Sequence, residues 1–299
     1  MKRTAATVLF TVVSLIGTAA AQKPADDSAK AAQPDAIGKV VGAMQEAEKG
    51  LSSLRMTLRT KGHVQNGLQV ETTGELRVLR GTQADAGERL YVRLEYSFGD
   101  GLKGRQETAR TADGIVQLEQ DSAFGAVLLR FDAAVVRDLE WAGGVLKRSD
   151  MPGMSDGRAQ SPLGSGTVRD LRRTFDLKIG ARKERDGEAG TWIEGKRKQG
   201  LDEQDPDLPV ADRVELFVRD ADHALLSARY FVGDDVVQEI TIEKLELGVE
   251  LGDDAFVVDG GGLELRDVRS YTPMWEQIEQ VLEKAESKAG EGVVRPSKR

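Results

Sequence analysis

The sequence predicts an α+β fold, in which a curved antiparallel β-sheet forms an open half-barrel with amphipathic helices as a lid and a helix at the C-terminus. Three observations predict this fold. Many segments alternate apolar and polar residues with the period of two that a half-solvated strand requires. Tight-turn dipeptides such as Asn66-Gly67 and Asp113-Gly114 stand between these segments. The last long segment, 237–251, changes phase, which requires an extra residue that bends the sheet.

The first 21 residues have the order of a secretory signal peptide. Lys2 and Arg3 precede an apolar stretch, 5–16, which is shorter than the roughly 18–20 residues of a spanning helix, and small residues follow up to Ala21. We expect cleavage after Ala21, then a flexible linker over 22–34. No Cys follows the small residues, so we expect an exported, soluble chain without a lipid anchor. The alternative is an uncleaved membrane anchor.

Composition limits the classes of function. The formal charge is −8, or −10 once Lys2 and Arg3 are removed, and an acidic chain of this kind is not expected to bind nucleic acid. The absence of Cys excludes thiolate nucleophiles, Cys metal sites and disulfides, so the fold must be held by its own core.

Helical spacing appears in three places. Apolar residues from Ile37 to Ala47 predict a first helix with Asp35 as its N-cap. Spacings of three and four predict a helical insertion over about 122–143, within a half-barrel domain that spans 35–268. A C-terminal helix that begins at Thr272 belongs to a last segment, 269–299, whose end from 293 onward is expected to be disordered. The residues of this insertion that are expected to form the lid are Phe124, Val127, Leu128 and Phe131.

Between these helices the strands alternate clearly, and their apolar positions are expected to share the concave face. The phase change lies between Ile242 and Leu245, so we expect a bulge near Glu243 and Lys244. The residues predicted to line a concave apolar cavity are Leu54, Met56, Leu76, Val78, Leu90, Val92, Leu94 and Tyr96.

Motifs for catalysis or metal binding are weak. His63 and His223 fall in a hairpin limb and a turn, and no nucleophile elbow, phosphate loop or zinc motif is present. The acidic loop 202–209 does not have the spacing of an EF-hand and is interpreted as a solvated loop. We therefore expect no cofactor, no metal and no catalytic residue. A hydrolase with a carboxylate pair stays as a third, weaker alternative.

The order of several motifs resembles a known family. The segments are L-S-S-L-R-M-T-L, G-E-L-R-V-L-R, T-A-D-G-I-V-Q-L, V-E-L-F-V-R-D-A-D-H-A-L-L and D-D-A-F-V-V-D, after a signal peptide and a helix. Together they look like the periplasmic outer-membrane lipoprotein carriers, the LolA-like lipoprotein-sorting proteins, over 37–259. The resemblance implies an open half-barrel that binds acyl chains beneath a helical lid. It also implies that Arg80, at the end of its limb, latches the lid by bonding to it.

These observations lead to one hypothesis and one rival. The chain is expected to be a non-catalytic periplasmic protein that binds lipidated proteins or other amphiphiles, as a carrier or a sensor, with possible inner- and outer-membrane complexes as partners. Its lid would exchange with acyl chains over the apolar face, because exposed apolar area costs about 25 cal/mol per Å². The rival is an envelope interaction or scaffold module without a ligand, which uses a sheet edge or the C-terminal helix.

Overall fold

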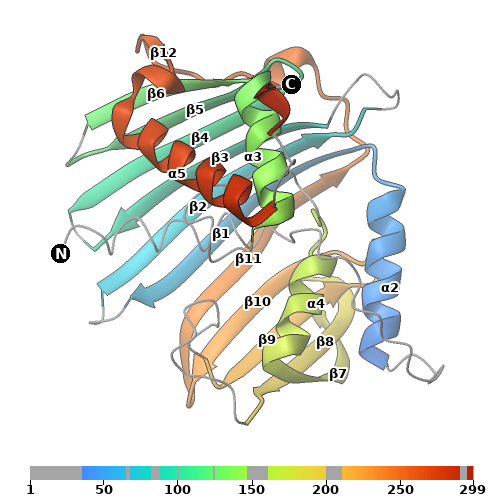
Figure 1. The fold of residues 1–299 in the computed structure, drawn as a ribbon. Helices are drawn as coiled ribbons and strands as arrows, with labels where there is room; N and C mark the ends of the chain where they lie inside the picture. The colour runs from blue at the N-terminus through green and yellow to red at the C-terminus, as the bar shows by residue number, and fades with distance from the viewer. Residues whose placement is uncertain are drawn as a thin grey trace.

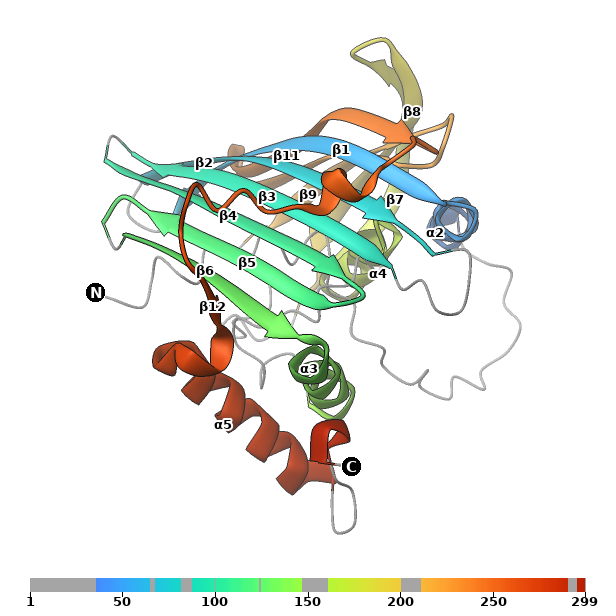
Figure 2. The same ribbon diagram turned by 90° about the horizontal axis from the view of Figure 1, so that it is seen from above.

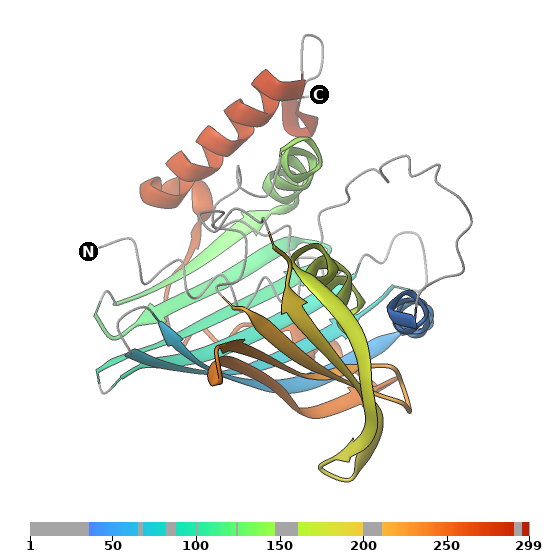
Figure 3. The same cartoon turned by 90° about the horizontal axis from the view of Figure 1, so that it is seen from below.

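The computed structural model describes residues 36–64, 68–81, 88–99, 101–123, 125–146, 161–199, 211–289 and 295–298. Within these ranges one twelve-stranded sheet is bent into an open trough that holds helices on its concave side (Figures 1 and 3). The strands are β1 (Ser53–Val64), β2 (Leu68–Leu79), β3 (Arg89–Phe98), β4 (Leu102–Thr111), β5 (Gly114–Asp121), β6 (Gly125–Asp132), β7 (Phe175–Arg185), β8 (Glu188–Arg197), β9 (Arg213–Arg219), β10 (Leu225–Val232), β11 (Asp235–Leu247) and β12 (Leu265–Asp267). The helices are α2 (Ala36–Lys49), α3 (Ala133–Val145), α4 (Ser165–Thr174) and α5 (Thr272–Ala289), with 3-10 turns η2 (Asp253–Phe256), η3 (Val268–Ser270) and η4 (Pro296–Lys298).

The strand order is β12-β6-β5-β4-β3-β2-β1-β11-β10-β9-β8-β7. Neighbours pair antiparallel except β12 and β6, which are parallel. Two runs of hairpins therefore meet where β1 pairs with β11, near the middle of the sheet. The predicted α+β fold, an open and curved antiparallel sheet, is confirmed.

The predicted bulge is confirmed on β11. Leu58 pairs with Ile242 whereas Thr57 pairs with Lys244, so Glu243 is the extra residue. Because of this insertion, Ile242 and Leu245 both lie opposite residues of the same face of β1. The bulge thus keeps Ile242, Leu245 and Leu247 on the concave side although the phase of the strand changes between them.

The helices cover the two ends of the trough. At one end, α3 and α5 pack on β5 and β6 through a cluster that includes Leu129, Phe131 and Leu139 (Figure 2). At the other end, α2 and α4 pack on β8, β9 and β10 through a second cluster that includes Met44 and Val168. The stretch formed by β1, β2 and β3 lies between these two ends (Figure 1).

One helix prediction was wrong at its start. Residues 125–132, expected within the helical insertion, form strand β6, and α3 begins only at Ala133 with Asp132 as its N-cap. The spacing misled because Leu128, on the convex face, is buried as well, while Arg130 on the same face is exposed. Val127 and Phe131 belong to the concave cluster with α3, while Leu128 lies against Gly260 on the convex side. Apolar residues on both faces give a continuous apolar run rather than an alternation.

The segment after β11 crosses the convex face. In η2, Phe256 is buried against Tyr91 and Ala109 of β3 and β4. The Arg77 guanidinium donates a hydrogen bond to the Ala255 carbonyl at 2.9 Å and lies 4.5 Å from the centre of the Tyr91 ring. The segment then reaches β12 at the edge of the sheet (Figure 2).

The C-terminal tail is more ordered than predicted. The prediction of disorder from 293 onward was wrong for residues 295–298, which include η4. The Ser297 N–H donates to Asp138 of α3 at 2.9 Å, and the Ser297 hydroxyl also donates to this carboxylate. Asp138 is buried and therefore needs these donors. The predicted signal peptide, the linker and the acidic loop 202–209 lie outside the described residues.

Candidate functional site

The candidate site is the apolar middle of the concave face. Three cross-strand rows run over β11, β1, β2 and β3, and every side chain in them is apolar apart from one glycine. The rows are Leu247-Leu54-Val78-Leu90, Leu245-Met56-Leu76-Val92 and Ile242-Leu58-Gly74-Leu94. We call these twelve residues the apolar floor. Four adjacent strands thus present one continuous hydrocarbon surface.

The structure brings together seven of the eight predicted cavity residues. All except Tyr96 belong to one buried cluster, which also contains Leu58 and Leu163. Tyr96 lies in the next row, where its ring covers Gly104 of β4 and its hydroxyl donates to Asp121 at 3.2 Å. The apolar alternation therefore predicted the floor correctly as a surface. Its role in ligand binding stays a prediction.

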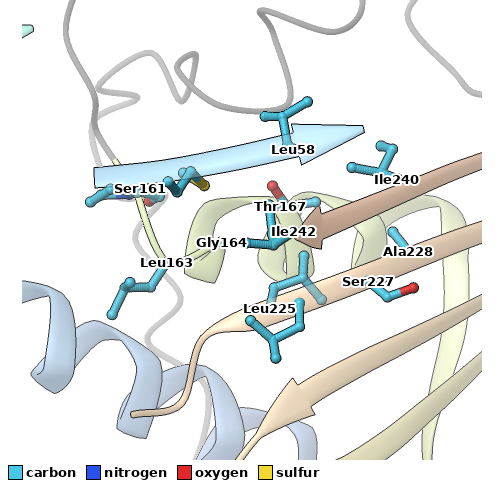
Figure 4. A pocket seen from close by; sticks show the side chains of 13 residues that line it. Leu58, Ser161, Leu163, Gly164, Thr167, Leu225, Ser227, Ala228, Ile240 and Ile242 are labelled. Atoms are coloured by element: carbon cyan, nitrogen blue, oxygen red, sulfur yellow. The ribbon is translucent and has the colours of Figure 1, made fainter. Parts of the chain in front are cut away.

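A cavity of about 60 Å³ opens at the border of the floor, between β1, β10, β11 and α4 (Figure 4). Its walls are mainly hydrocarbon, with the hydroxyls of Ser161, Thr167 and Ser227 as polar points. The remaining wall residues are Met56, Leu58, Pro162, Leu163, Gly164, Leu225, Leu226, Ala228, Ile240 and Ile242. Since one water needs about 10–15 Å³ of such space, the cavity has room for roughly four to six waters or a short piece of hydrocarbon.

Helix α4 forms one wall of this cavity, and its N-terminus is held by a carboxylate from another helix. Glu48 of α2 accepts hydrogen bonds from the backbone N–H groups of Leu163 and Ser165, both at 3.1 Å. It also accepts the Ser165 hydroxyl at 2.5 Å. Glu48 is only 6% exposed, so these bonds are formed away from solvent. A negative group at a helix N-terminus satisfies its free N–H groups and interacts favourably with the helix dipole.

The turn into α4 is also restricted sterically. Gly164 precedes the helix with a φ of +93°, a conformation that side chains rarely adopt. A Cβ at this position would lie 2.7 Å from the Cβ of Leu225. The backbone therefore approaches β10 closely at the rim of the cavity, and α4 is fixed at its first residue from two sides.

Arg80 lies at the same C-terminal end of α2 as Glu48. Its guanidinium donates to the Glu48 carbonyl at 2.5 Å, and Glu88 lies 3.6 Å away. Arg80 thus holds the C-terminal end of α2, while the side chain of the same Glu48 holds α4. Arg80 is thus connected to α4 through Glu48, and its role as a latch stays a prediction.

The predicted lid residues do not lie on a helix. Val127, Leu128 and Phe131 belong to β6, and Phe124 lies outside the described residues. The helix beside the cavity is α4, which is not among the three helices that the sequence predicts. Helix α5 has already buried its apolar stripe, including Ile278 and Leu282, against α3.

Sequence reasoning did not identify the part of the cavity wall that β10, β11 and residues 161–167 form. Strand alternation identified Ile240, Ile242 and Ala228 as apolar positions, but not as neighbours of Met56 and Leu58. That neighbourhood depends on the pairing of β1 with β11, about 180 residues later in the chain. No local signal specifies it.

No protein-family model matches the sequence, and no curated protein matches it either. Similar solved structures include the Pseudomonas aeruginosa MucA/MucB complex, with 14% identity and a TM-score of 0.41 over 75% of this chain and 61% of that chain. The lipoprotein LppX of Mycobacterium tuberculosis matches with 18% identity and a TM-score of 0.39 over 74% of this chain and 99% of that one. A putative outer membrane lipoprotein-sorting protein domain from Vibrio parahaemolyticus matches with 11% identity and a TM-score of 0.25, over 74% and 97%.

The structural neighbours therefore include a lipoprotein-sorting protein domain, the family that the sequence motifs resemble. The likeness is one of fold at low sequence identity, and the chain spans about three fifths of the length of the MucB chain it matches. Among the described helices, none has the length and apolar character needed to cross a membrane.

Proposed function

We propose that this chain is a non-catalytic periplasmic protein that binds the acyl chains of lipidated proteins or other amphiphiles, as a carrier or a sensor. The observation that supports this most strongly is the apolar floor, because four adjacent strands present three successive rows of hydrocarbon toward the inside of the trough. A cavity with apolar walls opens at its border. Small-molecule sites in proteins are typically apolar hollows of this kind with a few polar points.

In this proposal α4 is the moving cover. The cavity is too small for a whole acyl chain, so loading requires α4 to move away from β10 and β11. The chain would then replace protein side chains over the floor. Because apolar area is buried before and after, at about 25 cal/mol per Å², the exchange costs far less than exposing the floor to water.

The experiment is a titration of the purified protein with a fluorescent fatty acid, compared between two tryptophan variants of the same helix. Thr167→Trp places an indole at the cavity wall, whereas Arg169→Trp places it on a residue whose side chain is 48% exposed. We expect Thr167→Trp to weaken binding at least tenfold and Arg169→Trp to leave it unchanged. Lack of uptake by the wild-type protein, together with the absence of lipid in native mass spectra of protein isolated from the periplasm, would refute the proposal.

A further inference from the structure

The concave face is not apolar throughout. Beside the apolar floor, β4 and β5 place polar side chains on the same face: Thr108 pairs with Gln117, Gln106 pairs with Glu119, and Asp121 follows opposite Gly104. We call Thr108, Gln106, Gln117, Glu119 and Asp121 the polar lane. It lies between two apolar regions, since Val92 and Leu94 flank it on β3 and Leu129 and Val127 flank it on β6.

The polar lane carries negative charge. It holds the carboxyl groups of Glu119 and Asp121, and the basic residue at the end of the same face, Arg110, bonds to Glu140 of α3. Gln117 donates to Glu119 at 2.7 Å, and the Ala123 N–H donates to Asp121 at 2.6 Å. Burial raises the pKa of the half-buried Glu119 above its ordinary value.

A pair of aromatic rings reaches these carboxyl groups through Tyr96. The rings of Tyr96 and Phe98, on the concave face of β3, meet edge to face with centroids 5.5 Å apart. The Tyr96 hydroxyl donates to Asp121, and burial together with this carboxylate raises the pKa of Tyr96 to about 12. Aromatic faces next to carboxylates form the environment that attracts ammonium groups, through cation–π and charge interactions.

A row of polar residues connects the cavity to the polar lane. Across the sheet, Ile240 of the cavity wall pairs with Thr60, which pairs with Thr72, which pairs with Tyr96. Thr60 is only 5% exposed, and within the described residues its buried hydroxyl has no hydrogen-bond partner. A buried hydroxyl without a partner is unfavourable and thus indicates a position where a ligand group would bond.

We propose that the ligand of the concave face carries a positively charged amine or ammonium headgroup, held by Asp121, Glu119 and the Tyr96 ring, while its apolar chain lies on the apolar floor. This inference rests on the proposed function and adds the chemical class of the ligand. Strands are spaced by about 4.8 Å, so the distance from Thr60 on β1 to Asp121 on β5 is roughly 19 Å. The ligand is therefore a long-chain amphiphile rather than a small amine.

The test compares three amphiphiles with the same twelve-carbon chain, each below its critical micelle concentration, by titration calorimetry at pH 7. The probes are dodecyltrimethylammonium, dodecyl maltoside and dodecanoate, which are cationic, neutral and anionic. We expect the ammonium compound to bind at least tenfold more tightly than dodecanoate. The double variant Glu119→Gln, Asp121→Asn should lose this preference and keep its affinity for the maltoside.

The control is Asp113→Asn, which removes one negative charge from the exposed turn of the same hairpin, outside the polar lane. It should bind all three probes as the wild type does. Equal affinity of the wild type for the three probes, or a double variant that behaves like Asp113→Asn, would overturn this inference and leave the proposed function standing. Binding of none of the probes would overturn both. Circular dichroism of each variant checks that the fold is intact.

Discussion

Replacing Glu48 tests how α4 is held beside the cavity. In Glu48→Ala, the backbone N–H groups of Leu163 and Ser165 lose their acceptor in a buried position. The Ser165 hydroxyl loses the carboxylate and keeps its contact with the Ser161 hydroxyl at 3.3 Å. An unsatisfied buried group costs about 1–3 kcal/mol. Water that enters at the cavity rim would recover part of this, so we expect the free energy of unfolding to fall by about 2–4 kcal/mol.

The measurement is urea unfolding followed by circular dichroism, with Glu46→Ala as the control. Glu46 lies on the same helix, but its side chain is 72% exposed and bonds only to Lys49. Its loss should change stability by less than about 0.5 kcal/mol, because exposed ion pairs contribute little. The small gain in helix propensity is the same in both variants and cancels.

Glu48→Gln refines the result. The amide keeps one oxygen that accepts the two backbone N–H groups, so the loss should be about 1 kcal/mol. Hydrogen exchange of the α4 amides should become faster in the order wild type, glutamine, alanine. If Glu48→Ala is as stable as Glu46→Ala and exchanges at the wild-type rate, the carboxylate does not hold α4 and the reasoning is refuted.

Three further predictions concern caps, backbone and burial. Asp132→Ala should lower stability by about 1 kcal/mol at pH 7, because this N-cap also bonds to Arg269. These bonds lower the pKa of Asp132 from 3.8 to about 2. Its contribution to the free energy of unfolding is therefore present above pH 3.8 and lost as the pH falls toward 2, and urea unfolding at several pH values would show this loss. Gly164→Ala should lower the unfolding midpoint by the equivalent of about 1–3 kcal/mol, because of its positive φ and the close Leu225; an unchanged midpoint would contradict the described turn. Glu119→Gln should raise the melting temperature at pH 7. Burial raises the pKa of Glu119 in the folded state, so the contribution of this carboxyl group to stability is complete below pH 4.5 and is lost as the pH rises through the raised pKa. A difference in melting temperature between variant and wild type that does not shrink on acidification would contradict this sign.

Local alternation determined most of the concave surface. Residues such as Leu54, Leu76 and Leu94 share a face because side chains along a strand point alternately to opposite sides, and no distant contact is needed to establish this. The bulge at Glu243 was predictable for the same reason, since a change of phase on one strand requires an extra residue. The open antiparallel sheet followed from these patterns and from the turns between them.

The same local rule failed where a strand buries residues on both faces. Leu128 and Phe131 of β6 are buried on opposite sides, one under the segment around Gly260 and the other under α3. Periodicity reports exposure, so a buried apolar residue such as Leu128 on the otherwise exposed face interrupts the alternation. Only the packing of distant segments on β6 distinguishes it from a helix.

Tertiary structure alone decided where the cavity lies and what closes it. Glu48 and Ser165 are 117 residues apart, and their contact depends on the packing of two helices on the same end of the sheet. Likewise, Ile242 becomes a neighbour of Leu58 only when β11 pairs with β1. The sequence by itself determined which residues share a surface, because that is a matter of backbone geometry over a few residues. Which surfaces meet was decided by chain folding, because the free energy of burial does not depend on separation along the chain.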